Sequence, residues 1–248
     1  MIAGRTFVIG SLLAGVATST ALAQLAETEQ AVVNAYRTAI TSASAERAPR
    51  AIENAFSALG TMRDALMQVG AGRAMTPLES LSEGEFQILR QLPGAIINRD
   101  ETVFVEPDPD YFVKLAAARG EPADRAFFTA LKTTRSRSGW PVYIEQQTDY
   151  SGCIRFGSMS LVETYRAWSG FQRRFSGRYT AGVRKEIDDV LQALTTATCA
   201  CRDVASAETE LQRFQRDFPA SPARAAIDRR LQAIRGGRSD IRANCVSG

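Results

Sequence analysis

The residues best suited to chemistry lie in one short segment, from Trp140 to Arg155. It contains Glu145 and Asp149, and a pair of carboxyl groups is what acid–base hydrolysis of a glycan requires. If the segment is a strand, however, the two lie on one face about 13 Å apart, which exceeds the usual glycosidase separation. The segment could instead bind a ligand, or its aromatic rings could pack on a helical core. The binding candidates are Trp140, Tyr143, Gln146, Gln147, Tyr150 and Arg155.

The composition removes several other kinds of site. The 248-residue chain has no histidine, which excludes Ser-His-Asp and Cys-His catalysis and histidine-ligated zinc. The acidic run 106–110 could hold calcium, but its two prolines favour a stiff segment in which Asp108 or Asp110 caps the next helix. The net charge of +3 is too small to indicate nucleic-acid binding. We therefore expect no metal, no cofactor and no nucleic-acid partner.

Residues 1–23 have the pattern of a secretory signal peptide. A positive start that includes Arg5 precedes the apolar stretch 7–16, and Ala21 and Ala23 fit the small-x-small cleavage rule. A membrane anchor would need about 20 uninterrupted apolar residues, whereas the polar residues 18–20 break this stretch. We therefore expect cleavage after Ala23, a mature chain without a transmembrane anchor, and a periplasmic or secreted location.

The four cysteines of an exported chain are expected to form two disulfides. Cys153 precedes Cys199 by 46 residues, and Cys201 precedes Cys245 by 44. Because a helical hairpin returns the chain to its starting end, we favour the bridges Cys153–Cys199 and Cys201–Cys245, each clasping one hairpin. The crossed pairing, Cys153–Cys201 with Cys199–Cys245, remains the alternative. A bond between Cys199 and Cys201 would form a strained ring, and a soft-metal site there lacks histidine or methionine ligands.

The favoured pairing agrees with an internal repeat. Residues 171–175 match 214–218, and residues 187–194 match 227–234, with nine of these thirteen positions identical. The offset falls from 43 to 40 between the two matches, so the second copy is shorter in the turn between its helices. The sequence therefore predicts two related helical hairpins near the C-terminus.

Apolar residues three or four apart predict a mainly α fold of helical hairpins or a bundle. Short extended segments are expected near 96–105 and 141–156. We expect an N-terminal helical region at 24–134, an exposed linker at 134–139, and a C-terminal pair of disulfide-clasped hairpins at 140–248. The expected helices are near 27–45, 50–69, 82–93, 111–118, 122–133, 161–175, 183–194, 205–218 and 223–234.

The second hairpin resembles the tetratricopeptide-like repeats of bacterial envelope proteins, over about 30 residues. The resemblance is carried by Phe214, the Phe218-Pro219 and Ser221-Pro222 turn, Ala225-Ala226 and Leu231. The first hairpin departs from the pattern, since 176–179 replace the proline turn. The resemblance implies a helical surface that binds protein or peptide and carries no catalytic residues.

These observations favour an exported, non-enzymatic binding or scaffolding protein of the bacterial envelope. Its expected partner is a protein or peptide, or else cell-wall polymer. The competing hypothesis is a cell-wall hydrolase that uses Glu145 or Asp149.

Overall fold

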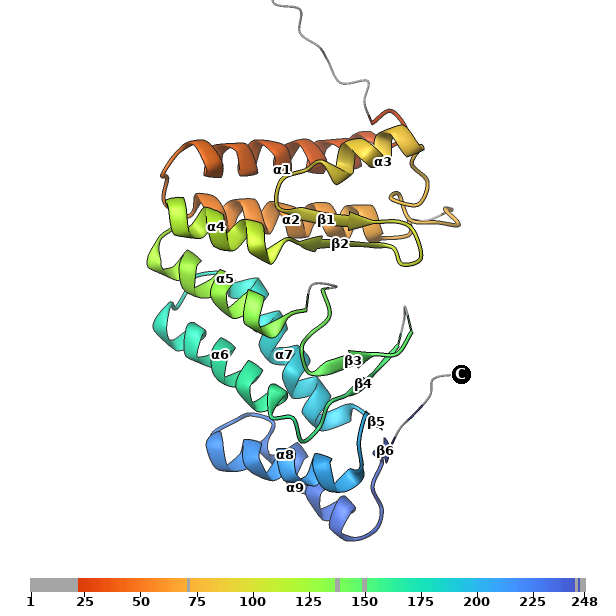
Figure 1. The fold of residues 1–248 in the computed structure, drawn as a ribbon, viewed down its shortest axis with the longest axis vertical. Helices are drawn as coiled ribbons and strands as arrows, with labels where there is room; N and C mark the ends of the chain where they lie inside the picture. The colour runs from red at the N-terminus through yellow and green to blue at the C-terminus, as the bar shows by residue number, and fades with distance from the viewer. Residues whose placement is uncertain (1–21, 71, 137–138, 149–150, 244, 246–248) are drawn as a thin grey trace, which may run out of the picture.

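The computed structural model describes residues 22–70, 72–136, 139–148, 151–243 and 245. It confirms the mainly α fold, with 58% of the described residues in helices. Successive helix pairs are stacked along the long axis of the molecule, from α1 and α2 at one end to α8 and α9 at the other (Figure 1). The helices are α1 (Glu27–Ala45), α2 (Ala51–Met67), α3 (Glu83–Arg90), α4 (Pro109–Arg119), α5 (Pro122–Thr134), α6 (Ser160–Arg174), α7 (Thr180–Thr196), α8 (Val204–Asp217) and α9 (Arg224–Arg235).

The strands are short and lie where extended structure was expected. Strands β1 (Ala95–Asn98) and β2 (Phe104–Pro107) form an antiparallel hairpin. A second sheet has the order β3-β4-β5-β6, in which only the first pair is antiparallel. Its strands are β3 (Ile144–Gln146), β4 (Gly152–Ile154), β5 (Cys199–Ala200) and β6 (Arg242–Ala243).

Side-chain caps begin α3 and α4 near the predicted positions. Ser82 and Glu85 form the capping box that starts α3. The Asp108 side chain accepts hydrogen bonds from the backbone of residues 110 and 111, so it caps α4. The structure therefore assigns the acidic run a capping role, and the described residues contain no group of three or more metal-ligating side chains.

The predicted repeat has matching geometry in the two hairpins. Phe175 and Phe218 end α6 and α8 with nearly the same backbone angles, and each backbone N–H donates to the phenylalanine four residues before it. The rings of Phe171 and Phe175 are 5.1 Å apart, as are those of Phe214 and Phe218. The equivalent residues Trp168 and Leu211 are both fully buried. The two hairpins are thus built on one pattern.

Two hydrophobic clusters form the core, and they meet in the first of these hairpins. Trp168, Phe171, Tyr179 and Val183 pack into the N-terminal cluster, although they belong to α6, α7 and the turn between them. Other residues of α6 and α7 pack into the C-terminal cluster. The apolar packing therefore continues across the boundary that was expected at 134–140.

Two charged residues of the N-terminal region fasten the turn between α6 and α7. Arg178 donates to Glu53 at 2.5 Å and to Asp124 at 3.0 Å. The Tyr179 hydroxyl donates to Asp124 at 2.7 Å, and the Tyr179 backbone N–H donates to Glu53 at 2.5 Å. Asp124 is only 2% exposed, so its charge is compensated within the protein by Arg178.

The expected linker is only partly exposed. Thr134 is buried, and the side chain of Arg135 is 13% exposed because it pairs with Glu186 of α7 at 2.6 Å. The start of the 134–139 segment therefore packs against α7, contrary to expectation. Residues 137–138 lie outside the described residues.

Candidate ligand-binding cleft

The residues that were expected to form a site differ in their exposure. Tyr143 is buried in the C-terminal core, and Trp140 is half-buried. Glu145 lies exposed on β3, where it pairs with Cys153 of β4, while Asp149 lies outside the described residues, as does Tyr150. Gln146, Gln147 and Arg155 are exposed.

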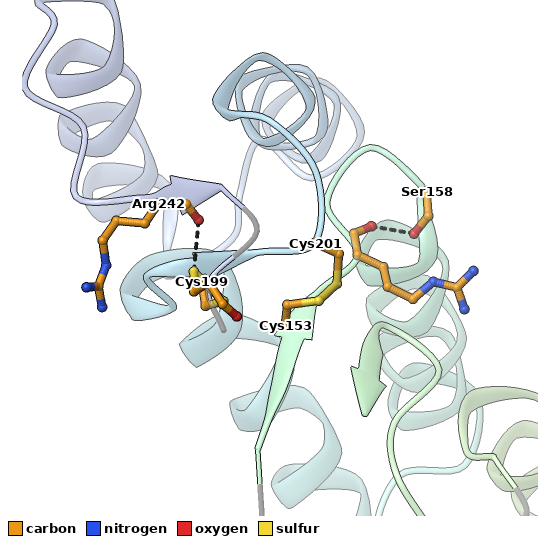
Figure 2. The surroundings of a disulfide bond; sticks show 7 residues. Cys153, Ser158, Cys199, Cys201 and Arg242 are labelled. Carbon is orange, nitrogen blue, oxygen red and sulfur yellow. Dashed lines mark hydrogen bonds between the residues drawn. A yellow bond between two sulfur atoms is a disulfide. The ribbon is translucent and has the colours of Figure 1, made fainter. Parts of the chain in front are cut away.

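The four cysteines are all bonded, but in the crossed pairing. Cys153 is joined to Cys201 and Cys199 to Cys245, with Cα separations of 4.9 and 5.6 Å. The favoured pairs Cys153–Cys199 and Cys201–Cys245 were therefore wrong. Figure 2 shows the Cys153–Cys201 bridge joining β4 to the segment after β5.

The position of β5 between two strands explains the crossing. The backbone N–H of Cys201 donates to Ile154 at 2.9 Å, which holds Cys201 beside β4. Cys199 pairs with Arg242 of β6, the strand that leads to Cys245. Each cysteine of the close pair therefore bonds toward a different neighbouring strand. Each bridge still spans one hairpin, as the repeat predicted.

A described cleft lies elsewhere, between α2, β2, α5 and the start of α7. It is a cleft of about 560 Å³, which is large enough for a peptide of a few residues. The rings of Phe56 and Phe127, 5.1 Å apart, are part of its lining. None of the described residues in 140–155 lines it.

Two helix glycines, one in the interior of α2 and one in the first turn of α7, keep this cleft open. Gly60 of α2 and Gly182 of α7 both line it. A Cβ atom at Gly60 would have no atom within 4 Å, and one at Gly182 would be 3.4 Å from the Phe127 ring. Neither glycine has a positive φ, so helical geometry does not require glycine there. Glycine within a helix costs about 0.5–1 kcal/mol relative to alanine, and what it provides here is space.

Four carboxylates line the cleft, and three are engaged by arginines. Glu53 accepts from Arg178, Asp64 pairs with Arg63 at 3.0 Å, and Glu186 accepts from Arg135 at 2.6 Å. The fourth is Glu106 of β2. Within the described part of the chain, the carboxylate of Glu106 makes no hydrogen bond or ion pair, so it is the lining carboxylate that remains available to a ligand.

The surroundings of Glu106 disfavour its charge. Burial raises the pKa of Glu106, and the nearby cations of Arg135, Arg63 and Lys185 only partly oppose this rise. The stem of Glu106 is also confined, because a Cβ atom at Gly139 would lie 2.9 Å from its Cγ. A perturbed carboxyl group without a partner, in a cleft, is a typical feature of a functional site.

Sequence reasoning did not predict this cleft. Glu106 was assigned to an acidic linker, and its neighbours in space come from helices far away along the chain. The available signal was Gly60, which lies inside the expected helix 50–69, because an isolated helix glycine often has a packing or functional reason. Gly182 precedes the expected helix 183–194 and gave no such signal.

Comparisons with known proteins add no relative: no family model, no curated protein and no solved structure matches the chain. In the described part of the chain, no helix is both long enough and apolar enough to cross a bilayer.

Proposed function

We propose that this chain is an exported, non-enzymatic binding protein of the bacterial envelope, and that its cleft holds an amine-bearing peptide. The observation that carries the proposal is Glu106, the one lining carboxylate that has no partner among the described residues. The two disulfides support export, because such bonds persist in oxidising compartments.

The charges of the lining favour a ligand with a cationic group. The lining cation Arg50 donates to the Gly177 backbone oxygen at 3.3 Å, whereas Arg63, Arg135 and Lys185 each have a carboxylate partner, at 3.0, 2.6 and 2.6 Å. These arginines and this lysine are therefore less available to an anionic ligand than Glu106 is to a cationic one. An ammonium group at Glu106 would form a charge-assisted hydrogen bond and favour the ionised form of the carboxyl. The phenyl rings of Phe56 and Phe127 supply the apolar part of the site.

The same pairings weigh against the hydrolase hypothesis. Glycan hydrolysis usually needs two free carboxyl groups, one acting as acid and the other as base or nucleophile. In the cleft, the carboxylate of Glu186 already accepts two hydrogen bonds from Arg135. Glu145 is exposed on β3, outside the cleft. A single free carboxylate suits recognition better than this reaction.

Calorimetric titration with two defined probes tests the proposal. The peptide Ala-Lys-Ala, used with both ends blocked by acetyl and amide groups, should bind, whereas Ala-Gln-Ala blocked in the same way and a peptide-free glycan fragment should bind at least tenfold more weakly. Glu106→Gln should weaken binding of the lysine peptide about tenfold or more, since a hydrogen bond between charged groups contributes about 1.5–3 kcal/mol. Glu145→Gln serves as the matched control and should bind normally. Preferred binding or turnover of the glycan would overturn the proposal in favour of a polymer-binding or hydrolytic role.

A further inference from the structure

Glu85 holds the segment where the signal peptide is expected to end. Its carboxylate lies in the capping box of α3, and the residue is 8% exposed. One oxygen accepts a hydrogen bond from the backbone nitrogen of Gln24 at 2.8 Å. The other accepts from the Ser82 hydroxyl at 2.6 Å. A carboxylate of α3 thus reaches the first residue after the expected cleavage point, 61 positions earlier in the chain.

The Gln24 side chain strengthens this attachment. Its Oε1 atom accepts a hydrogen bond from the Ser82 backbone N–H at 2.7 Å. The next residue, Leu25, is 3% exposed and belongs to the N-terminal core. The hydrogen bond to Glu85, the hydrogen bond that the Gln24 side chain accepts from Ser82, and the burial of Leu25 together fix the position of the Gln24 nitrogen.

From this geometry we infer that Glu85, with Ser82, forms a binding site for the chain's own new amino terminus. Cleavage after Ala23 would convert the Gln24 nitrogen from a neutral amide donor into an ammonium group beside the Glu85 carboxylate. A charge-assisted hydrogen bond is roughly twice as strong as a neutral one, so removal of the leader would tighten the contact between the start of the chain and α3. The inference rests on the export part of the proposed function and is independent of the cleft.

The electrostatics of Glu85 agree with this assignment. Burial alone would raise the pKa of Glu85, but the hydrogen bonds from the Gln24 backbone and from Ser82 together lower it. The carboxyl is therefore ionised at neutral pH and able to pair with an ammonium group. Cleavage would also remove Leu22, which is 6% exposed in the same core, so the new ion pair would offset part of a lost apolar contact.

The pairing has a chemical consequence for an amino-terminal glutamine. Such a residue can cyclise when its α-amino nitrogen attacks the side-chain amide carbon, forming a new C–N bond and releasing ammonia. In the folded chain the nitrogen is held by Glu85 and the amide oxygen by Ser82. Cyclisation should therefore be slow in the folded protein and faster where Glu85 is replaced.

The test begins with the protein exported through its own leader, followed by mass determination of its amino terminus. We expect a free amine on Gln24. Two chains are then compared, one beginning at Gln24 and one beginning at Ala23, each with Glu85 or with Glu85→Gln. Only in the chain that begins at Gln24 is the Gln24 nitrogen charged. Glu85→Gln should lower the melting temperature of the chain that begins at Gln24 several degrees more than that of the chain that begins at Ala23. In the chain that begins at Gln24, it should also speed ammonia loss at least threefold.

The outcomes separate this inference from the proposed function. Suppose that cleavage occurs after Ala23, but Glu85→Gln lowers the melting temperature of both chains equally and leaves the rate of cyclisation unchanged. That result would overturn this inference alone. Cleavage at another position would also overturn it, while leaving export intact. Failure of the chain to be exported would overturn the inference together with the envelope location.

Discussion

The backbone N–H of Gly157 donates to the carboxylate of Glu210 at 2.6 Å, which fastens the start of α6 to the middle of α8. The other carboxylate oxygen of Glu210 accepts from Leu161 at 3.1 Å. Glu210 is fully buried. A carboxylate of the second hairpin thus accepts hydrogen bonds from backbone N–H groups near the start of α6, in the first hairpin. The first N–H groups of a helix have no partner within the helix and need such an acceptor.

Replacement of Glu210 should therefore loosen the contact between the hairpins. Glu210→Ala leaves buried N–H groups without an acceptor, and each such group costs about 1–3 kcal/mol. Glu208, on the same helix, forms a partly exposed ion pair with Arg235, and Glu208→Ala should cost less than about 1 kcal/mol. Urea unfolding of the two variants measures the difference. Equal losses would show that Glu210 does not have this role.

Arg178 should be essential to the attachment of the α6–α7 turn to the N-terminal region. Arg178→Ala removes the cation that compensates buried Asp124 and should cost about 3–5 kcal/mol. The matched control is Arg213→Ala at an exposed position of α8, whose ion pair with Asp217 is partly exposed and should contribute less than about 1 kcal/mol. Thermal unfolding distinguishes them, and a small loss for Arg178→Ala would argue against a structural role of the network.

Glu106 should make stability depend on pH in a defined direction. Its folded pKa is raised above the usual 4.5, so its contribution is fully present below the unfolded pKa and is lost as pH rises through the folded value. At neutral pH the charged form is therefore unfavourable, and Glu106→Gln should unfold at a higher temperature than the parent. This advantage should shrink below about pH 4. If the stability advantage of Glu106→Gln instead grew as the pH fell, the result would contradict a raised pKa of Glu106.

The disulfide pairing can be tested with paired serine variants. Replacing Cys153 and Cys201 together should leave the Cys199–Cys245 bond and no free thiol. Replacing Cys153 and Cys199 together should leave the thiols of Cys201 and Cys245 without their partners, and both should react in the freshly denatured protein. Thiol labelling counts the free thiols in each variant. Two free thiols in the Cys153 and Cys201 variant, and none in the Cys153 and Cys199 variant, would restore the tandem pairing Cys153–Cys199 with Cys201–Cys245. Loss of either bond should cost about 4 kcal/mol in the chain-entropy estimate.

The helices were predictable from sequence because their signals are local. Apolar spacing placed α2 near 50–69, and the Ser82–Glu85 capping box marked the start of α3. The repeat likewise placed equivalent phenylalanines at equivalent helix ends. These features depend on residues within a few turns of one another, so one segment contains the information.

The cleft and the disulfide pairing depend on contacts between distant segments. Glu106 and Glu186 line one cleft although 80 positions separate them in sequence. The choice between Cys199 and Cys201 as the partner of Cys153 was decided by the strand order of a small sheet, which hairpin reasoning does not specify. The Trp140–Arg155 segment attracted functional hypotheses because of its residue types, yet Tyr143 is mainly a core residue.

The most direct test of the central claim fills the cleft from a helix glycine and measures binding of Ala-Lys-Ala by calorimetry. Gly60→Leu places a side chain in the open space of the cleft, whereas Gly170→Leu, in the interior of α6, lies outside it. We predict that Gly170→Leu binds like the parent and that Gly60→Leu remains folded but loses at least tenfold in affinity. Unchanged binding by folded Gly60→Leu would contradict the assignment of the cleft as the ligand site.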